Sequence, residues 1–500
     1  MKKIIVIGGG VAGLAAGIYL RANGYNVSVI EKNATVGGAC IGWERSGCYI
    51  DGCIHWLAGV NPKTQMHKLW RDTHAIKDDT EIFYQDELTK YKFTDGSALE
   101  LWADVDKLEK SLIKFAPEDK RQIKKLTALI RKFQRVDPPS NKPVELMNIF
   151  ELLKIAFTML GVYIRIIKTS AISCKMLSKK FKNDKLRDVI EHFMAPNYNF
   201  MSMLYMLGHI SGKDGGIPVG GSLDMVKRME RRFLDLGGNL ILRTSVQKII
   251  VENNVATGVM LKDGQTLNAD WVVSTVPIEH CLSELLENKY PDKTFDFRLK
   301  DPKTYPIYTY TTVVFKCPET VKEKFLSVNV SLDKPIKLNA DFNRVVFRNY
   351  CYDQTLKHTD GYFVVQATIH DNDGMYFWWK DKKENGTYKQ EKARIAKEVL
   401  EIAKTVYPDA ASALEVIDVV TPMTYERYLN SRHGGFQGFI HTNTGKSLMH
   451  KGRIKGLKNF IIAGQWIIRS GGLPPAVMSG RFAAQRICHT DKKKFVNPTY

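Results

Sequence analysis

The chain is poor in cysteine, with 8 cysteines among 500 residues. This density is too low for a disulfide-stabilised scaffold and favours buried, reduced thiols in a cytosolic protein. Three of the cysteines cluster at Cys40, Cys48 and Cys53, but no Cys-x-x-Cys pair is present there. A structural zinc on these thiols is the minor alternative. No other metal spacing and no Ser-His-Asp order stands out among the 12 histidines, so we predict no metal site.

Long uncharged hydrophobic runs are also missing. The apolar runs are short or interrupted by charged and polar residues, so the sequence predicts no transmembrane helix. The first 20 residues resemble a signal peptide in their positive start and apolar run. Their glycine spacing and the lack of a small-residue cleavage site instead predict a strand and a helix of the mature fold. We expect a cytoplasmic protein.

Acidic residues are outnumbered. The chain has 73 Lys and Arg against 53 Asp and Glu, a formal net charge of +20. Such a surface attracts nucleic acid, acidic lipid head groups or phosphorylated ligands. No RNA-binding motif accompanies the charge and the lysines are spread along the chain, so no nucleic-acid partner is expected. The hydrophobic content of 44% and charged content of 25% exclude a disordered or fibrous chain.

The first thirty residues carry the most informative motif. A buried strand is expected at 3–7, a helix at 11–23 and a second strand at 27–30. The turn between the first strand and the helix carries the G-x-G-x-x-G spacing, formed by Gly8, Gly10 and Gly13. This order predicts a dinucleotide-binding unit, with the pyrophosphate at the N-terminus of the helix.

Each residue of the motif has a physical role. Gly8 permits the tight turn, Gly10 lets the backbone approach the pyrophosphate, and Gly13 allows the helix to pack closely on the strand. Glu31, followed by Lys32, ends the second strand, where an acid hydrogen-bonds ribose hydroxyls. A glycine-rich turn without a ligand is the alternative.

Later segments favour FAD over NAD. A Gly37–Gly38 doublet follows the acid, and residues 237–274 are expected to form short strands with turns at 253–254 and 263–264. Near the C-terminus a strand at 460–463 meets Gly464, and a glycine-rich loop leads into a helix from about Ala476. No second G-x-G-x-x-G follows a strand. Electrons are therefore expected to pass to or from oxygen, a quinone or a separate reductase.

Together these segments resemble the FAD-dependent superfamily of phytoene desaturases, carotenoid cis–trans isomerases and all-trans-retinol saturases. The matching positions are 8–17, Glu31, Gly37–Gly38, Asp51–Gly52, His55, 218–226, 237–274 and 472–484. The chain departs from the amine-oxidase pattern at Ala39, where Gly-Gly-Arg is common, and has Gln465 where flavoproteins often have Asp.

The resemblance implies an α/β fold. Its FAD-binding domain, of the Rossmann type and glutathione-reductase-like, is expected to be assembled from 1–60, 214–278 and 455–500. An α+β substrate domain, with a mixed or antiparallel sheet and a helical lid, is expected from 61–213 and 279–454. The expected cofactor contacts are Gly8, Gly10, Gly13, Glu31, Lys32, Gly37, Gly38, Val246, Gly464, Gln465, Gly472, Leu473 and Ala476. His55 is the candidate catalytic residue, for positioning substrate or tuning the flavin; a structural histidine is the alternative.

The segments between the cofactor pieces are expected to hold the substrate. Residues 144–168 are apolar with interspersed charges and precede a run of lysines, which suits either an amphipathic helix on anionic lipid or a core helix with a solvated face. Methionines and aromatics at 193–207 suit either a tunnel for a long apolar chain or a plain core. Strands are expected at 307–315 and 362–380. The second includes Trp378–Trp379, which suit the core, the cavity roof or an interfacial anchor.

These observations predict a FAD-dependent oxidoreductase acting on carbon–carbon bonds of an apolar polyene or isoprenoid lipid. Desaturation or saturation would proceed by hydride transfer at flavin N5. A polyene cis–trans isomerase and an amine oxidase on the same fold are the alternatives, and a basic nucleic-acid-binding flavoprotein is the alternative outside catalysis. The substrate is expected to be lipid-like, and peripheral contact with the inner face of an anionic membrane is a further expectation.

Overall fold

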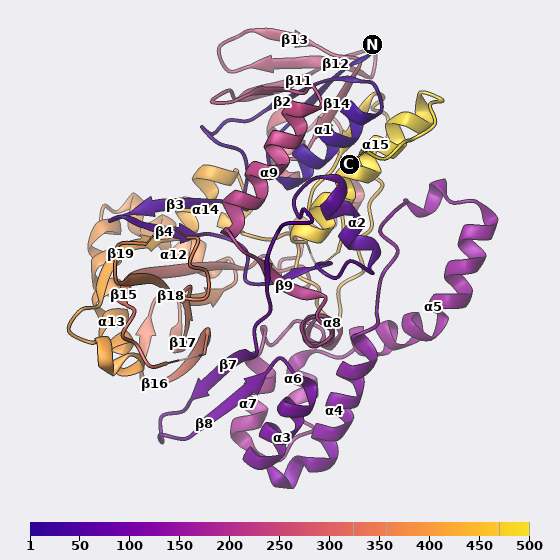
Figure 1. Cartoon of the computed structure of the whole chain (residues 1–500). Helices are drawn as coiled ribbons and strands as arrows, with labels where there is room; N and C mark the ends of the chain where they lie inside the picture. Colours follow the sequence, from indigo (N-terminus) through magenta and orange to yellow (C-terminus); the bar gives the residue numbers. More distant parts are fainter. Residues whose placement is uncertain (324, 357, 470, 500) are drawn as a thin grey trace.

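The structure, a computed structural model, describes residues 1–323, 325–356, 358–469 and 471–499. A parallel five-stranded sheet lies at the top of the molecule in Figure 1, in the order β10–β2–β1–β14–β20. Its strands come from the two ends and the middle of the chain. They are β1 (Lys3–Ile7), β2 (Asn26–Ile30), β10 (Asn239–Ile241), β14 (Trp271–Ser274) and β20 (Phe460–Ile462).

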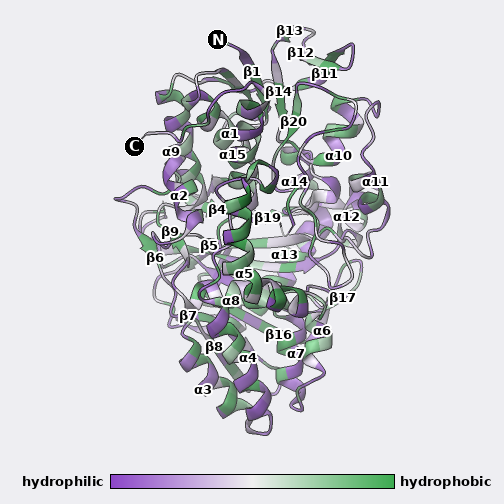
Figure 2. Cartoon of the chain, turned by 90° about the vertical axis from the view of Figure 1, so that its right-hand side faces the viewer, coloured by the Kyte–Doolittle hydropathy of each residue, from purple (hydrophilic) through white to green (hydrophobic). Residues whose placement is uncertain are grey.

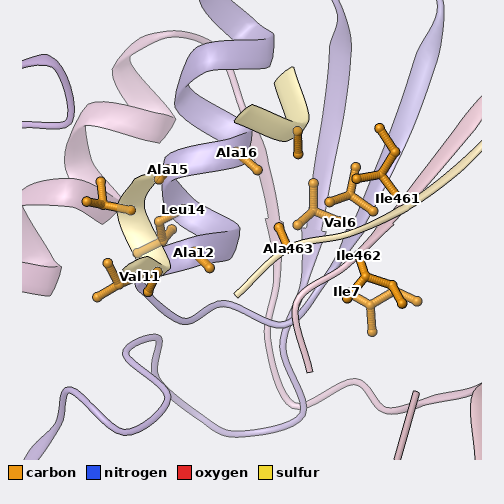
Figure 3. Close-up of a cluster of buried hydrophobic side chains, with 14 of the residues drawn as sticks. Val6, Ile7, Val11, Ala12, Leu14, Ala15, Ala16, Ile461, Ile462 and Ala463 are labelled. Carbon is orange, nitrogen blue, oxygen red and sulfur yellow. The ribbon is translucent and has the colours of Figure 1, made fainter. Parts of the chain in front are cut away.

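Three helices and a small antiparallel sheet pack around these strands. Helix α1 (Val11–Ala22) packs on β1 and β2 and is flanked by α9 (Gly221–Asp235) and α15 (Leu473–Thr490). Figure 3 shows the apolar contact, in which Ala12 and Ala16 of α1 lie on the side of the helix toward Val6 of β1. The antiparallel sheet packs against β14; its strands are β11 (Val246–Glu252), β12 (Val255–Leu261) and β13 (Thr266–Asn268).

A larger mixed sheet forms the second layer. Its order is β19–β15–β18–β17–β16–β7–β8, and its neighbours are antiparallel except for β16 and β7. Helices α12 (Gly374–Glu384) and α13 (Tyr388–Val406) pack against it. Its strands are β7 (Glu87–Lys92), β8 (Ala98–Trp102), β15 (Thr309–Pro318), β16 (Ser327–Lys337), β17 (Asp341–Asn349), β18 (Tyr362–Asp371) and β19 (Glu415–Val420).

A helical layer closes the lower part of the molecule around a separate apolar core (Figure 1). Helix α5 (Ile149–Ser170) lies along its edge and begins at Asn148, whose side chain forms a capping box with Glu151. The other helices of this layer are α3 (Val105–Phe115), α4 (Lys120–Phe133), α6 (Cys174–Ser178), α7 (Asp184–His192) and α8 (Phe200–Ser211).

Short elements connect these layers. The remaining strands are β3 (Gly42–Arg45), β4 (Cys48–Asp51), β5 (Leu57–Ala58), β6 (Ile82–Phe83) and β9 (Gly215–Pro218). The remaining α-helices are α2 (Gln65–Asp72), α10 (Ile278–His280), α11 (Lys293–Lys300) and α14 (Pro422–Leu429). Single helical turns of other types lie at Pro117–Asp119, Val144–Leu146, Cys281–Leu285, Pro408–Ala410 and Arg432–Gly434.

The fold class predicted from the sequence is confirmed, as are the strand–helix–strand unit at the N-terminus and the turns at 253–254 and 263–264. Two predictions were wrong in detail. The last helix begins at Leu473 instead of about Ala476, because two prolines are tolerated in a first helical turn. The strand predicted at 362–380 ends at Asp371, and the rest belongs mostly to α12.

The start of α12 explains this second error. The Asn372 side chain accepts a hydrogen bond from the Gly374 N–H at 2.9 Å, which turns the chain into a helix. Met375, Tyr376 and Trp379 then bury one helical face, and the Trp379 indole N–H donates to the Thr311 hydroxyl at 2.7 Å. Trp379 is therefore a core residue of the large sheet.

The described residues include no helix long and apolar enough to cross a membrane. Every cysteine has a free thiol. Within the same described ranges, no group of three or more His, Cys, Asp or Glu side chains converges as metal ligands would.

Candidate functional site

A large cavity of about 1480 Å³ runs from the nucleotide motif to the helical layer. Its lining includes every predicted cofactor residue except Gly13, and also His55. The end near β1 and β2 is built mainly from glycines and polar groups, whereas the end near α5 and α8 is built mainly from methionine, isoleucine and aromatic side chains. The cavity volume exceeds the roughly 300–1,000 Å³ of ordinary small-molecule sites.

The turn between β1 and α1 forms a cradle without side chains. Gly8 has φ +102°, and its N–H donates to the Ile30 carbonyl at 2.8 Å. Gly10 is the N-cap of α1, and no side chain caps that helix. The first-turn N–H groups of α1 are therefore directed at the cavity, which makes this helix end a site for an anionic phosphate.

The glycine doublet forms the opposite wall of this cradle. The Gly37 N–H donates to the Gly9 carbonyl at 2.9 Å, and Gly10 pairs with Gly37 as an isolated parallel bridge. Both doublet residues have positive φ, +131° at Gly37 and +60° at Gly38. A ligand in the cradle thus meets backbone from two segments that lie close in space, with no side chain between them.

Glu31 is held firmly where the ribose would lie. It is buried, and its carboxylate accepts the Gly9 N–H and the Asn33 N–H, each at 2.8 Å. Lys32 also lines the cavity, and its ammonium donates to the Arg427 carbonyl at 2.9 Å and to the Asn430 side chain at 2.5 Å. Burial lowers the pKa of Lys32. Glu31 therefore has a pre-organised orientation, and the side chain of Lys32 closes the cavity edge against the segment before Ser431.

The C-terminal part of the cradle is stabilised by its own side chains. Gly464 has φ +116°, and its N–H donates to the Ser479 hydroxyl at 2.8 Å. The Gln465 side-chain oxygen accepts the Gly472 N–H at 2.8 Å, so this glutamine ties the strand end to the loop before α15. Gly472 is the N-cap of α15 and carries no side-chain cap, while Leu473 and Ala476 line the cavity from the first turn. A second helix N-terminus is thus directed at the cavity.

Other cavity residues were missed by sequence reasoning. Val246, which was expected, lines the cavity beside Thr244 and Ser245, which were not. The segment 427–431 also lines it, although its sequence carries no motif. These residues line the cavity only because the start of β11 and the end of α14 fold back toward the nucleotide sheet. Residues 427–431 gave no local signal that could have revealed their place.

The substrate half is lined by one face of α8. Met201, Tyr205 and His209 follow each other at intervals of four residues, so they share a helix face, and all three line the cavity. Phe200 and Met203, on the other side of the helix, are buried in the core of the helical layer. Residues 193–207 therefore contribute both to the core and to the cavity wall, and Met201 belongs to both. Whether the cavity is a tunnel for a long apolar chain stays a prediction.

His55 lines the cavity in this half, and its carbonyl accepts a hydrogen bond from the Arg348 guanidinium at 2.9 Å. Burial lowers the pKa of His55 well below its usual value, and the nearby Arg348 and His370 lower it further. The imidazole is therefore neutral near neutral pH. A neutral imidazole can donate or accept one hydrogen bond toward a ligand.

Two acidic residues line the same half. Asp214 pairs with His209 Nδ1 at 2.6 Å and accepts the Asn61 N–H at 3.1 Å. Asp137 accepts the Gln65 N–H at 3.1 Å, and burial raises its pKa, helped by the neighbouring Asp214. Both carboxylates thus already form hydrogen bonds with groups of the protein.

The cradle residues fit FAD. Two uncapped helix N-termini and a wall of glycine backbone suit a pyrophosphate, and a buried, oriented carboxylate suits an adenosine ribose. The length of the cavity beyond the cradle leaves room for a flavin ring and a long substrate.

Comparison with known proteins agrees with this geometry. A family described as "Flavin containing amine oxidoreductase" matches residues 11–488. The chain is 24% identical to a 1-hydroxycarotenoid 3,4-desaturase from Flavobacterium sp. (strain P99-3), covering 98% of this chain and 100% of the relative. It is 23% identical to a lycopene-forming phytoene desaturase from Paracoccus sp., covering 97% of each.

Among solved structures, a putrescine oxidase variant superposes with a TM-score of 0.61 at 16% identity, covering 98% of this chain and 99% of that one. At this identity the likeness concerns the fold alone. The family and the cradle thus lead to the same cofactor, FAD.

Proposed function

The chain belongs to the flavin containing amine oxidoreductase family, within its phytoene-desaturase-like branch, and from this premise we propose that it oxidises or reduces a carbon–carbon bond of an apolar polyene or isoprenoid lipid. The protein is a FAD-dependent oxidoreductase. Bound FAD accepts or supplies the hydride, and the protein binds and orients the chain. The observation that carries the proposal is the continuity of the FAD cradle with a long, mainly apolar cavity.

The apolar half suits a linear chain. Met194 and Met201 line it from the α8 side, and Leu152, Ile155 and Met159 line it from α5. Thioethers and branched aliphatic side chains adapt to an extended hydrocarbon without demanding hydrogen bonds from it. The neutral His55 adds one polar contact and no charge.

An anaerobic single-turnover experiment tests the proposal. The FAD-loaded protein is mixed in its oxidised form, and after reduction with dithionite, with all-trans-retinol, a cis-carotenoid or a simple amine. Bleaching of the oxidised flavin by a polyene that loses two hydrogens supports desaturation. Reoxidation of the reduced flavin by a polyene that gains two hydrogens supports saturation. Rearrangement at constant mass supports the isomerase alternative.

Amine oxidation is the second candidate, because Asp137 and Asp214 line the substrate half and a carboxylate attracts an ammonium group. Both carboxylates already accept hydrogen bonds from the protein, which makes this the weaker candidate. Bleaching of the oxidised flavin by the amine, with none by the polyenes, would establish it over polyene chemistry.

A lipid substrate needs a route from a membrane, and α5 offers a surface for it. Phe150 and Phe157 are 78% and 90% exposed, and most of the outward face of α5 is apolar (Figure 2). The inward face lines the cavity, so one helix separates the substrate half from the surroundings. The exposed large apolar residues of α5 are Ile149, Phe150, Leu153, Phe157, Leu160, Tyr163, Ile164 and Ile167.

Charge around α5 favours an anionic leaflet. The nearby acids Glu145 and Glu151 are paired with Arg486 and Lys142, each at 2.8 Å. In the described part of the chain, Lys154, Arg165 and Lys168 of α5 have no acidic partner within 4.0 Å. An apolar helix face edged by unpaired cations suits peripheral binding to acidic lipid. Oxygen, a quinone or a separate reductase would complete the electron transfer.

A further inference from the structure

A guanidinium group without a counter-ion lies in the substrate half of the cavity. Arg469 lines the cavity close to Tyr163 of α5 and Tyr205 of α8. Toward the described residues, its side chain forms a single hydrogen bond, from Nη1 to the Ser447 hydroxyl, at a long 3.4 Å. Among the described residues, no carboxylate lies within 4.0 Å of it.

Two buried arginines of this protein are paired with acids, whereas a third, Arg298, donates to two backbone carbonyls. Arg481 contacts Asp72 at 3.0 Å, and Arg486 contacts Glu145 at 2.8 Å. Arg469 is half-buried, and this burial lowers its pKa, which means that the surroundings disfavour its charge. A half-buried charge loses part of its hydration, and an ion-pair partner would offset that loss. Since the protein supplies no acid, the cavity is the direction from which a partner can come.

The carboxylates of Asp214 and Asp137, which line the cavity, do not serve as the acidic partner of Arg469. Asp214 forms hydrogen bonds with His209 and the Asn61 N–H, and Asp137 accepts the Gln65 N–H. The side chain of Tyr205 stacks on His209, with ring centroids 3.9 Å apart. Neither acid forms an ion pair with Arg469.

We propose that Arg469 anchors an anionic oxygen group of the substrate, a carboxylate above all, so that the substrate is an apolar chain with a charged end and not a pure hydrocarbon. This inference rests on the proposed function for the apolar part of the chain. The Tyr205 hydroxyl can assist as a donor, because burial raises its pKa and keeps it protonated. A guanidinium binds a carboxylate through two parallel hydrogen bonds, a geometry that an ammonium or an alkyl end cannot reproduce.

The charge of Arg469 also bears on the second candidate function. A cationic amine entering the same half would meet a like charge that has no local neutralising partner. The anchor therefore favours acids over amines of the same chain length.

The test compares ligands that differ only at their polar end. FAD-loaded protein is titrated with all-trans-retinoate, all-trans-retinol and the hydrocarbon of the same skeleton, following tryptophan fluorescence and the visible flavin difference spectrum. The variants are Arg469→Gln and Arg469→Lys, with Arg453→Gln as a matched control, because Arg453 lies outside the cavity and contacts Thr490. We expect wild-type protein to bind retinoate at least tenfold more tightly than the hydrocarbon.

Arg469→Gln should abolish that preference, Arg469→Lys should keep part of it, and the control should keep all of it. Equal affinities for the three ligands in wild-type protein would overturn the anchor. So would an Arg469→Gln protein that loses FAD but keeps its retinoate preference, because the guanidinium would then serve the cofactor.

If wild-type protein binds none of the three polyenes, the proposed function fails and the anchor is judged separately with octanoate and octylamine. A preference for octanoate that disappears in Arg469→Gln supports the anchor without the polyene. No preference in wild-type protein overturns both.

Discussion

Gly13 and Gly8 are in contact across the turn that joins β1 to α1: a Cβ on Gly13 would lie 1.9 Å from the Gly8 carbonyl oxygen. This contact lets α1 start directly above the strand and aims its first N–H groups at the cavity. Gly13 itself does not line the cavity, so its contribution to cofactor binding is indirect.

Gly13→Ala should therefore weaken FAD binding without touching the ligand. The added methyl group must push α1 away from β1, and overpacking of this kind costs about 1–3 kcal/mol. We expect a lower FAD content after purification and a lower melting temperature. Gly161→Ala is the control, because a Cβ there meets only an Arg165 nitrogen at 4.0 Å. In a helix this change stabilises by about 0.5–1 kcal/mol, so loss of FAD in the control would refute the packing argument.

Glu31→Gln should raise the dissociation constant of FAD about tenfold, equal to about 1.4 kcal/mol. The carboxylate accepts two backbone N–H groups, and an amide would place its own donors against one of them. Titration of deflavinated protein with FAD, followed by flavin fluorescence, measures the change. Glu252→Gln, at an exposed position of β11, is the control and should bind FAD as the wild type does. An unchanged affinity in Glu31→Gln would remove this carboxylate from the ribose site.

Asp72→Asn should destabilise the whole fold. Asp72 and Arg481 form an ion pair at 3.0 Å in which both side chains are almost fully buried, and the Tyr19 hydroxyl donates to the same carboxylate at 3.0 Å. Removing the negative charge leaves a buried guanidinium unpaired, which costs about 3–5 kcal/mol. Asp78→Asn breaks an exposed pair with Arg71 and should cost about 0–1 kcal/mol. Urea unfolding measures both, and equal midpoints would contradict the expectation.

The nucleotide half could be predicted from the sequence because its signals are local. Gly8, Gly10 and Glu31 act within thirty residues, and strand and helix periods fix their relative places. The role of Gly13 was also readable, since close packing is what a glycine at that spacing permits. Lys32 is expected at the cofactor and does line the cavity, but its ammonium bonds to the C-terminal end of α14, a contact across about 400 residues of chain that no local pattern encodes.

The substrate half could be predicted only in outline. The composition of 193–207 indicates a tunnel or a core, and the helix faces of α8 are needed to see that Met201 lines the cavity while Met203 does not, although both belong to the core. Arg469 gave no signal, because its meaning depends on the absence of an acid nearby in space. The expected division of the chain into 1–60, 214–278 and 455–500 against the remainder stays a prediction, as does the role of His55.

Stability should fall between pH 6.5 and about 4, in part through His441. Burial, with the nearby Arg469, lowers the pKa of His441 to about 4. The unfolded chain, with a histidine pKa near 6.5, then binds a proton that the folded protein does not, so each pH unit lost in this window costs up to about 1.4 kcal/mol. His441→Gln should flatten the slope of unfolding free energy against pH there, and should leave the slope above pH 7 unchanged. An identical slope below pH 6.5 would show that His441 titrates normally in the folded protein.

The outward face of α5 makes the last prediction. Phe150→Ser and Phe157→Ser each remove one exposed aromatic side chain from this face; Phe150 is 78% exposed and Phe157 is 90% exposed. Neither change should cost much folding stability, because neither ring is packed. If this face enters an anionic leaflet, each change should weaken binding to vesicles containing phosphatidylserine by roughly tenfold, since burying such a ring in an apolar phase is worth about 1.5–3 kcal/mol.

Phe377→Ser is the matched control, because Phe377 is 50% exposed but lies on α12, packed against the large sheet. Vesicle co-sedimentation at low and high salt checks the result: binding should fall in both α5 variants and with salt, and stay at the wild-type level in the control. Equal loss in all three variants would mean that general hydrophobicity, and not α5, holds the protein to lipid.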